Sequence, residues 1–139
     1  MAATRVLLDA GPLVGYVNRN DQYHDWAAKR WGGLFEPAWT CEAVISEAIF
    51  LMQSTGLEID PILELLERGI IRVDFALDEH RADVIRLLRK YADQPMSLAD
   101  ACLVRMAELW DACQVFTTDK DFRVYRRNGR HVIPLLAPF

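Results

Sequence analysis

Four acidic residues of this 139-residue chain stand in apolar surroundings: Asp9, Glu47, Asp100 and Asp119. Two of them follow short apolar runs, and two lie on or beside the apolar faces of predicted helices. Carboxylates that are buried close together repel one another and shift toward protonation. A hard divalent cation removes this conflict, and oxygen ligands without nearby His or Cys select Mg²⁺ or Mn²⁺ over zinc. The pattern therefore predicts a magnesium or manganese site.

Each acid also has a structural explanation when it is considered alone. Asp9 and Asp119 could cap the helical segments that follow them, and Ser97 with Asp100 fits a capping box. Glu47 could form an ordinary surface ion pair. The four structural explanations are less satisfactory together, because two of the acids end strands on one side of a sheet and two lie beside apolar helix faces.

The segment RVLLDAG at residues 5–11 is the expected central strand. Its apolar run stops at an acid and a Gly-Pro turn signal, which is typical of a parallel strand buried on both faces. Further strands are predicted at residues 38–41, 70–73, 115–117 and 131–135. Helices are predicted at 13–17, 21–31, 42–54, 60–69, 78–91 and 97–110, with a helical turn at 119–125. This alternation predicts an α/β fold with a central, mainly parallel sheet between helical layers.

The composition predicts one soluble globular domain over residues 1–139. Apolar residues make up 52% and charged residues 26%, and no apolar stretch is long enough to cross a membrane. The N-terminus leads directly into the first strand, so we expect no signal peptide. An odd number of cysteines without a Cys-x-x-Cys pair favours buried thiols in a reducing, cytoplasmic setting. The net charge of −4 argues against a protein that coats nucleic acid, but allows an enzyme with one local basic face.

Five segments resemble the PIN-domain ribonucleases in order and spacing, and resemble most closely the VapC-type toxins of prokaryotic toxin–antitoxin pairs. They are LLDAGPLVGYV (7–17), DQYHDWAAKRW (21–31), ISEAIFLM (45–52), SLADACLVRMAE (97–108) and FTTDKDF (116–122). The likeness spans essentially the whole chain. It implies a PIN-like α/β/α sandwich and a metal-dependent endoribonuclease, with no departure at the four acidic positions.

The resemblance also implies the roles of individual residues. Asp9, Glu47, Asp100 and Asp119 take the metal-binding positions. Asp121 is a fifth acid for an outer shell or a second metal, and Thr117 or Thr118 is a supporting hydroxyl. One or two cations would activate a water molecule for in-line attack on phosphorus, with Glu47 or Asp121 orienting that water or taking its proton. Hydrolysis of this type leaves a 5′-phosphate and a 3′-hydroxyl.

A basic cluster follows Asp119 and is the expected RNA contact. Its members are Lys120, Arg123, Arg126, Arg127 and Arg130, with Tyr125 among them as a surface on which a base could stack. The alternative is an ordinary solvated face near the C-terminus. By resemblance, we also expect a homodimer and a small antitoxin partner that lays its C-terminal segment across the toxin.

Two other functions remain open at this point. One is a catalytically silent PIN-like scaffold that binds RNA or a protein. The other is a different phosphotransfer enzyme, but a phosphatase of the aspartyl-phosphate type needs a second Asp where this chain has Gly11. A receiver-like domain needs acids before the first strand, where this chain has Ala3-Thr4-Arg5. The three histidines lie in unrelated contexts, which argues against a metal-free histidine mechanism.

Overall fold

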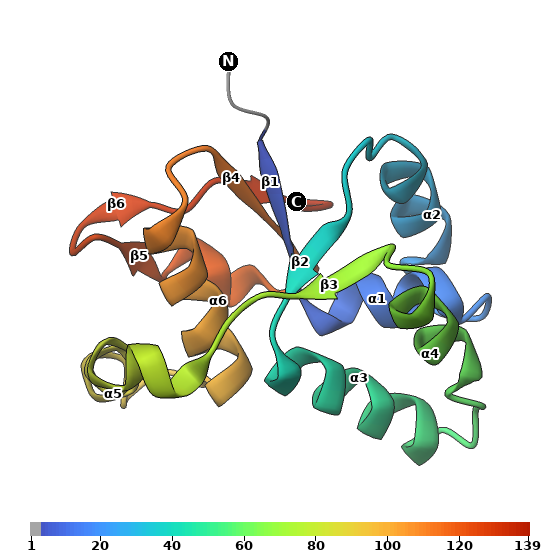
Figure 1. The fold of residues 1–139 in the computed structure, drawn as a ribbon, viewed down its shortest axis with the longest axis horizontal. Coiled ribbons are helices and arrows are strands. Elements are labelled where there is room, and N and C mark those ends of the chain that lie inside the picture. The colour runs from blue at the N-terminus through green and yellow to red at the C-terminus, as the bar shows by residue number, and fades with distance from the viewer. Residues whose placement is uncertain (1–3) are drawn as a thin grey trace.

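A central parallel sheet organises the computed structural model, which describes residues 4–139. Its strands lie in the order β3 (Ile71–Val73), β2 (Ala38–Thr40), β1 (Arg5–Leu8), β4 (Cys113–Phe116) and β7 (Leu135–Leu136). Every neighbouring pair is parallel. The predicted α/β fold is therefore confirmed, with the strand that carries Asp9 at the centre of the sheet (Figure 1).

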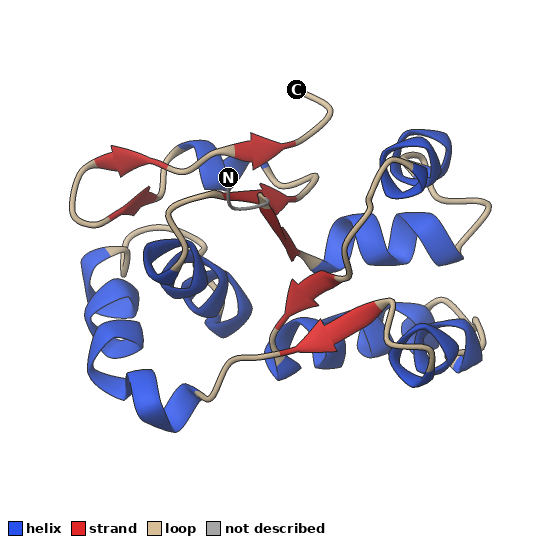
Figure 2. Ribbon diagram, turned by 45° about the horizontal axis from the view of Figure 1, so that its top comes forward, coloured by secondary structure: helices blue, strands red, loops and turns tan. Residues whose placement is uncertain are grey.

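Helices cover the sheet from two sides (Figure 2). The helices α1 (Ala10–Val17), α2 (His24–Gly32), α3 (Glu42–Ser54) and α4 (Asp60–Glu67) lie on one side, and α5 (Arg81–Lys90) and α6 (Leu98–Leu109) lie on the other. Helices α3 and α6 also contact each other. The faces that carry Glu47 and Asp100 therefore belong to neighbouring helices.

The buried apolar side chains form one cluster that includes residues of β1, β4 and α6. Leu7, Leu8 and Phe116 have no exposed surface, as the both-face burial of parallel strands requires. The three cysteines are buried and free, as predicted. Within residues 4–139, every helix is too short or too polar to cross a membrane.

Several helix boundaries differ from the prediction. The helix predicted to start at Asp21 begins at His24, and the one predicted at 60–69 ends at Glu67. Gly11 and Pro12 do not form a turn after β1 but lie in the first turn of α1, because Asp9 caps this helix and proline is tolerated in a first turn. The segment predicted as one helix at 78–91 is a 3₁₀ turn, η1 (Leu77–His80), followed by α5.

The C-terminal region holds a strand that the sequence did not predict. A hairpin pairs β5 (Arg126–Arg127) with β6 (His131–Val132) in antiparallel fashion. Asn128 and Gly129 adopt positive φ values of 52° and 89° in its turn, at the predicted position. The strand predicted at 131–135 is divided between β6 and β7, and the intervening Pro134 accepts a hydrogen bond from the Val115 backbone at 2.9 Å.

Candidate active site

The carboxyl ends of β1 and β4 meet at the centre of the site. Leu8 pairs with Phe116 in the parallel register, and the Asp9 amide donates to the Phe116 carbonyl at 3.0 Å. The residues that follow these strands therefore lie side by side. The Thr117 hydroxyl donates to Asp9 Oδ2 at 2.6 Å, and both side chains are buried.

Asp9 is both a helix cap and a member of the site. Its Oδ1 accepts the Ala10 amide at 2.8 Å, which starts α1, while its Oδ2 is held by Thr117. The two roles are compatible because a carboxylate has two oxygens with about four acceptor positions. The structural explanation for Asp9 is thus correct without excluding the functional one.

Asp119 and Asp121 lie in the turn directly after Thr117. The Thr117 hydroxyl oxygen accepts the Asp119 amide at 2.9 Å, and Asp119 Oδ1 accepts the Asp121 amide at 2.8 Å. This second bond caps the 3₁₀ turn η2 (Lys120–Arg123). The hydroxyl of one buried threonine therefore bonds to both the side chain of Asp9 and the backbone amide of Asp119.

Asp100 lies in the first turn of α6, where the predicted capping box is present. Its amide donates to Ser97 Oγ at 3.1 Å, and its Oδ2 accepts the Ser97 amide at 3.2 Å. The same oxygen accepts a hydrogen bond from the hydroxyl of Tyr125, also at 3.2 Å. The residue is only 6% exposed. Its two hydrogen bonds from other residues thus fall on one oxygen, Oδ2.

Glu47 projects from α3 and is exposed, so it lies at the solvent side of the site rather than inside it. Partial burial, then the charges of Asp100 and Asp119, nevertheless raise the pKa of Glu47, and its own charge contributes to the raised pKa of Asp9. The ion pairs formed among residues 4–139 do not include Glu47. The surface ion pair considered from the sequence is therefore not formed.

Burial and mutual repulsion govern the electrostatics of the four acids. Burial, then the charges of Asp100 and Glu47, raise the pKa of Asp9 to about 7, although bonds from Thr117 and Ala10 oppose the shift. Burial is also the largest cause of the raised pKa of Asp100, followed among the raising causes by the charge of Asp119. None of the ion pairs formed within residues 4–139 gives these acids a basic partner. The four carboxylates thus share one electrostatic environment.

The chemistry of this set fits a divalent cation, because its donors are carboxylate oxygens that repel one another. As they stand, however, no three Asp, Glu, His or Cys side chains within the described part of the chain form a ready-made metal-binding group. The four acids lie close enough for their charges to interact, but their coordination of a metal stays a prediction.

The two predicted hydroxyls differ in position. Thr117 contacts Asp9 directly, whereas Thr118 faces the first turn of α1. A Cβ atom at position 11 would collide with Thr118 Oγ1, so a glycine is needed for this approach. Thr117 is therefore the residue that supports the site acids, and Thr118 packs against the helix that Asp9 caps.

The predicted basic cluster separates into exposed and engaged residues. Lys120 and Arg123 are exposed beside the site turn. The half-buried Arg126 donates to three carbonyls of its own turn. Arg127 donates to the carbonyls of Ala107 at 3.0 Å and Trp110 at 3.2 Å, so it caps the far end of α6. The carbonyls of Ala107 and Trp110 lie about 10–15 Å along the helix from Asp100 at 1.5 Å per residue, so the guanidinium of Arg127 is engaged away from the site acids.

Tyr125 was predicted as a surface on which a base could stack, and that prediction is wrong. Its side chain is fully buried and its hydroxyl bonds to Asp100. Sequence reasoning missed this role because Tyr125 stands among basic residues. The i, i+3 spacing of Phe122 and Tyr125 on a helical turn was the available signal that both point inward.

Comparison with known families identifies the class of protein. The family model described as "PIN domain" matches residues 6–128, so the chain belongs to the PIN-domain family. PIN domains are generally nucleases and typically use divalent metals, which supports a hydrolase. A comparison with curated proteins found no significant match.

Proposed function

We propose that this protein is a Mg²⁺- or Mn²⁺-dependent endoribonuclease. The observation that carries the proposal is a set of four acids without a basic partner among residues 4–139: burial and then the charges of neighbouring acids, Asp119 among them, raise the pKa values of Asp9, Glu47 and Asp100. A group of buried acids of this kind costs stability unless a cation binds to it. Membership of a nuclease family supports the same reading.

In this proposal, Asp9, Asp100, Asp119 and Glu47 hold the cation. A bound divalent cation supplies polarisation of the scissile phosphodiester and activation of water. Thr117 keeps Asp9 in place through its 2.6 Å hydrogen bond. Glu47 is exposed and Asp121 half-buried, and burial, then the charge of nearby acids, raises the pKa of each, so either can orient the attacking water or accept its proton. The expected products carry a 5′-phosphate and a 3′-hydroxyl.

Lys120 and Arg123 are the basic residues best placed to bind RNA phosphates beside these acids. Both are exposed, and both belong to the turn η2 that follows Asp119. Arg126 is half-buried and takes a secondary place, because its guanidinium already donates to backbone carbonyls. Positive charge next to the acids offsets the repulsion between them and a polyanion.

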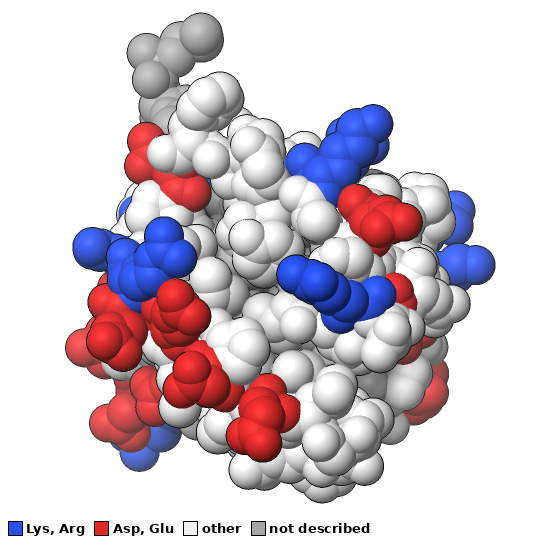
Figure 3. Space-filling model, turned by 90° about the vertical axis from the view of Figure 1, so that its right-hand side faces the viewer, with Lys and Arg blue, Asp and Glu red and all other residues white. Residues whose placement is uncertain are grey.

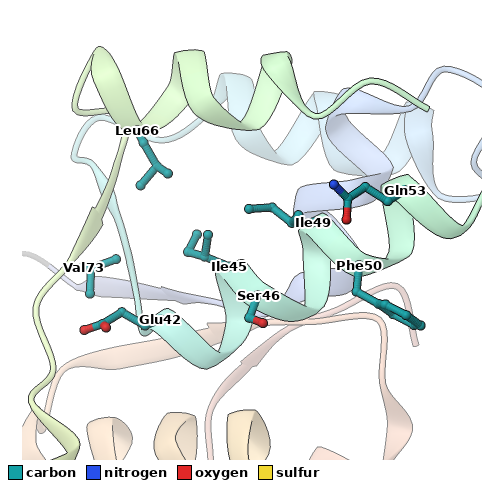
Figure 4. A pocket seen from close by; sticks show the side chains of 8 residues that line it. All are labelled: Glu42, Ile45, Ser46, Ile49, Phe50, Gln53, Leu66 and Val73. Atoms are coloured by element: carbon teal, nitrogen blue, oxygen red, sulfur yellow. The ribbon is translucent and has the colours of Figure 1, made fainter. Parts of the chain in front are cut away.

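We further propose that the nuclease acts in the cytoplasm as the toxin of a toxin–antitoxin pair and forms a homodimer. A groove of about 550 Å³ between α3 and α4 supports an antitoxin partner. Figure 4 shows Ile45 and Ile49 of α3 directed toward Leu66 of α4, with Glu42 at one end. Apolar walls with an acidic end suit an apolar segment that carries a basic side chain.

The surface around the helices α2 and α4 adds to this support. Seen from the right-hand side of Figure 1, the molecule presents uncharged surface interrupted by Lys and Arg side chains, with a run of acidic side chains along its lower left (Figure 3). The exposed acids of α4 and its flanks are Glu58, Asp60, Glu64 and Glu67. A basic partner segment could pair with these acids, although Lys29, Arg30 and Arg68 are exposed on the same two helices and their flanks.

A catalytically silent scaffold that binds RNA or a protein is the second candidate. It shares the fold and the acids, so only turnover separates the two functions. The test incubates a structured RNA with the purified chain in Mg²⁺, in Mn²⁺ and in EDTA, beside Asp9→Asn and Asp100→Asn. Metal-dependent cutting that leaves 5′-phosphate ends and is absent from both variants supports the nuclease. Cutting that persists in EDTA or in both variants contradicts the carboxylate mechanism. Stabilisation by metal without turnover favours the scaffold.

A further inference from the structure

Tyr125 is a fully buried tyrosine whose hydroxyl bonds to an acid of the site. A buried tyrosine hydroxyl needs a hydrogen-bond partner, and a backbone carbonyl is the commonplace choice. Here the partner is Asp100 Oδ2 at 3.2 Å. The bond crosses from the segment after η2 to the first turn of α6, and so joins two segments that carry site acids.

The ring of Tyr125 is fixed on two sides by other aromatic rings. Phe122 meets it edge-on at 5.3 Å between centroids, and Tyr91 at 5.1 Å. The Tyr125 amide donates to the Asp121 carbonyl at 3.2 Å, which ties its backbone to the turn of the site. The hydroxyl therefore reaches Asp100 from a rigid support.

The bond also distinguishes the two oxygens of Asp100, since one accepts hydrogen bonds from the described residues and the other does not. Oδ2 accepts the Ser97 amide and the Tyr125 hydroxyl, both at 3.2 Å. Oδ1 receives no hydrogen bond from the residues that the structure describes. The two hydrogen bonds to Oδ2 fix the rotation of the carboxylate and leave Oδ1 free to coordinate a cation.

We propose that Tyr125 is a positioning residue that orients Asp100 so that Oδ1 faces the cation, and that it holds the Asp119–Asp121 turn at a set distance from α6. This inference rests on the proposed metal-dependent function. Partners of this kind around metal ligands typically change metal affinity by about 10- to 100-fold when they are removed.

The test measures Mn²⁺ binding by titration calorimetry with Tyr125→Phe, which keeps the ring and removes only the hydroxyl. Tyr91→Phe is the matched control, since Tyr91 lies in the same aromatic cluster but its hydroxyl accepts the Arg126 amide at 2.8 Å instead. We expect Tyr125→Phe to weaken Mn²⁺ binding about tenfold and Tyr91→Phe to change it by less than about twofold. Thermal unfolding of the metal-free proteins measures any general loss of structure.

The Mn²⁺ dependence of RNA cleavage supplies a second readout. For Tyr125→Phe we expect the half-saturating Mn²⁺ concentration to rise about tenfold and the rate at saturation to stay within about threefold of the parent. Equal Mn²⁺ affinity in the parent and Tyr125→Phe, or equal weakening in Tyr91→Phe, overturns the positioning role while the nuclease stands. Mn²⁺ binding in the parent no tighter than in Asp100→Asn overturns the proposed function, and the inference with it.

Discussion

The two ends of α6 carry acids whose carboxylates are partnered differently. Asp100, in the first turn, is a buried residue, and Glu108, in the last turn, is half-buried as a residue but has a side chain that is only 2% exposed. Glu108 accepts hydrogen bonds from Arg86 at 3.0 Å and Arg105 at 3.3 Å. Asp100 accepts only the Ser97 amide and the Tyr125 hydroxyl from other residues among those described.

The helix dipole explains part of this difference. The amino end of a helix favours a negative charge, and the carboxyl end disfavours one. Glu108 therefore needs its two guanidinium partners and the Asn128 amide at 2.8 Å. Asp100 tolerates a site without a cationic side chain, yet burial and the charge of Asp119 still raise its pKa. A buried acid that is fully paired is structural, whereas one that repels its neighbours is available to a ligand.

The largest expected effect separates the two acids by activity. Asp100→Asn should reduce metal-dependent RNA cleavage by more than about 100-fold, because removing a ligand costs more than the 10- to 100-fold of a supporting partner. Glu108→Gln, the matched change on the same helix, should stay within about threefold at a temperature where it is folded. Single-turnover cleavage at fixed Mn²⁺ concentration measures both. Equal losses in the two variants would remove the functional distinction between the two ends of α6.

The pH dependence of stability gives the next effect. Asp9 has a pKa of about 7 in the folded protein, against an ordinary value near 3.8. Between these values the folded state binds more protons than the unfolded state, so the free energy of unfolding falls as pH rises. Between pH 5 and pH 7 the loss is about 2–3 kcal/mol, since each unit is worth about 1.4 kcal/mol. Urea unfolding in EDTA should therefore show a steeper fall for the parent than for Asp9→Asn.

Two outcomes of that measurement are informative. If Asp9→Asn is the more stable protein at pH 7 and the less stable one at pH 5, the charged form of Asp9 is destabilised in the folded protein by burial and by the charges of Asp100 and Glu47. If the free energies of unfolding of the two proteins changed in parallel with pH, the pKa of Asp9 would not be raised in the folded protein, and the prediction would be wrong. Added Mn²⁺ should stabilise the parent alone, because a ligand that binds only the folded state raises its stability.

Removing the charge at the carboxyl end of α6 should destabilise the protein at pH 7, whereas removing the charge of Asp9 should stabilise it. Glu108→Gln should lower the free energy of unfolding by about 1–2 kcal/mol at pH 7, because Arg86 and Arg105 lose a charged acceptor. Arg86 is 44% exposed, so water recovers part of the lost interaction. Urea unfolding at low and high salt measures the loss, which should shrink in high salt. An unchanged stability would show that Glu108 is held by the Asn128 amide alone.

Local patterns predicted the central features of the site. Asp9 and Asp119 were predictable because each follows an apolar run, and such runs become neighbouring strands of a parallel sheet. Asp100 was predictable because Ser97-Leu-Ala-Asp100 is a capping box, and the helix it starts packs through its apolar face. These features depend on neighbours in the sequence or on a period of two or 3.6 residues.

The features that escaped prediction depend on contacts between distant segments. Arg127 resembles its basic neighbours in sequence, but the β5–β6 hairpin carries it to the carbonyl end of α6, 16–20 residues away along the chain. Tyr125 reaches Asp100 across 25 residues. Neither partnership has a periodic signature, so a single sequence shows the residue but not its partner.

The smallest expected effect tests whether the basic residues, like the acids of α6, separate into one that binds a ligand and one that is structural. In an Asp100→Asn background that does not cut, Arg123→Ala should weaken RNA binding several-fold and reduce the slope of log K against log salt concentration by about one, as loss of a phosphate contact does. Arg127→Ala should leave RNA affinity and slope unchanged, but should lower the free energy of unfolding by about 1 kcal/mol, since the carbonyls of Ala107 and Trp110 lose their donor. Filter binding at several salt concentrations, with urea unfolding of the same proteins, separates the two. A reduced salt slope in Arg127→Ala would show that Arg127, at the carboxyl end of α6, also contacts RNA phosphates.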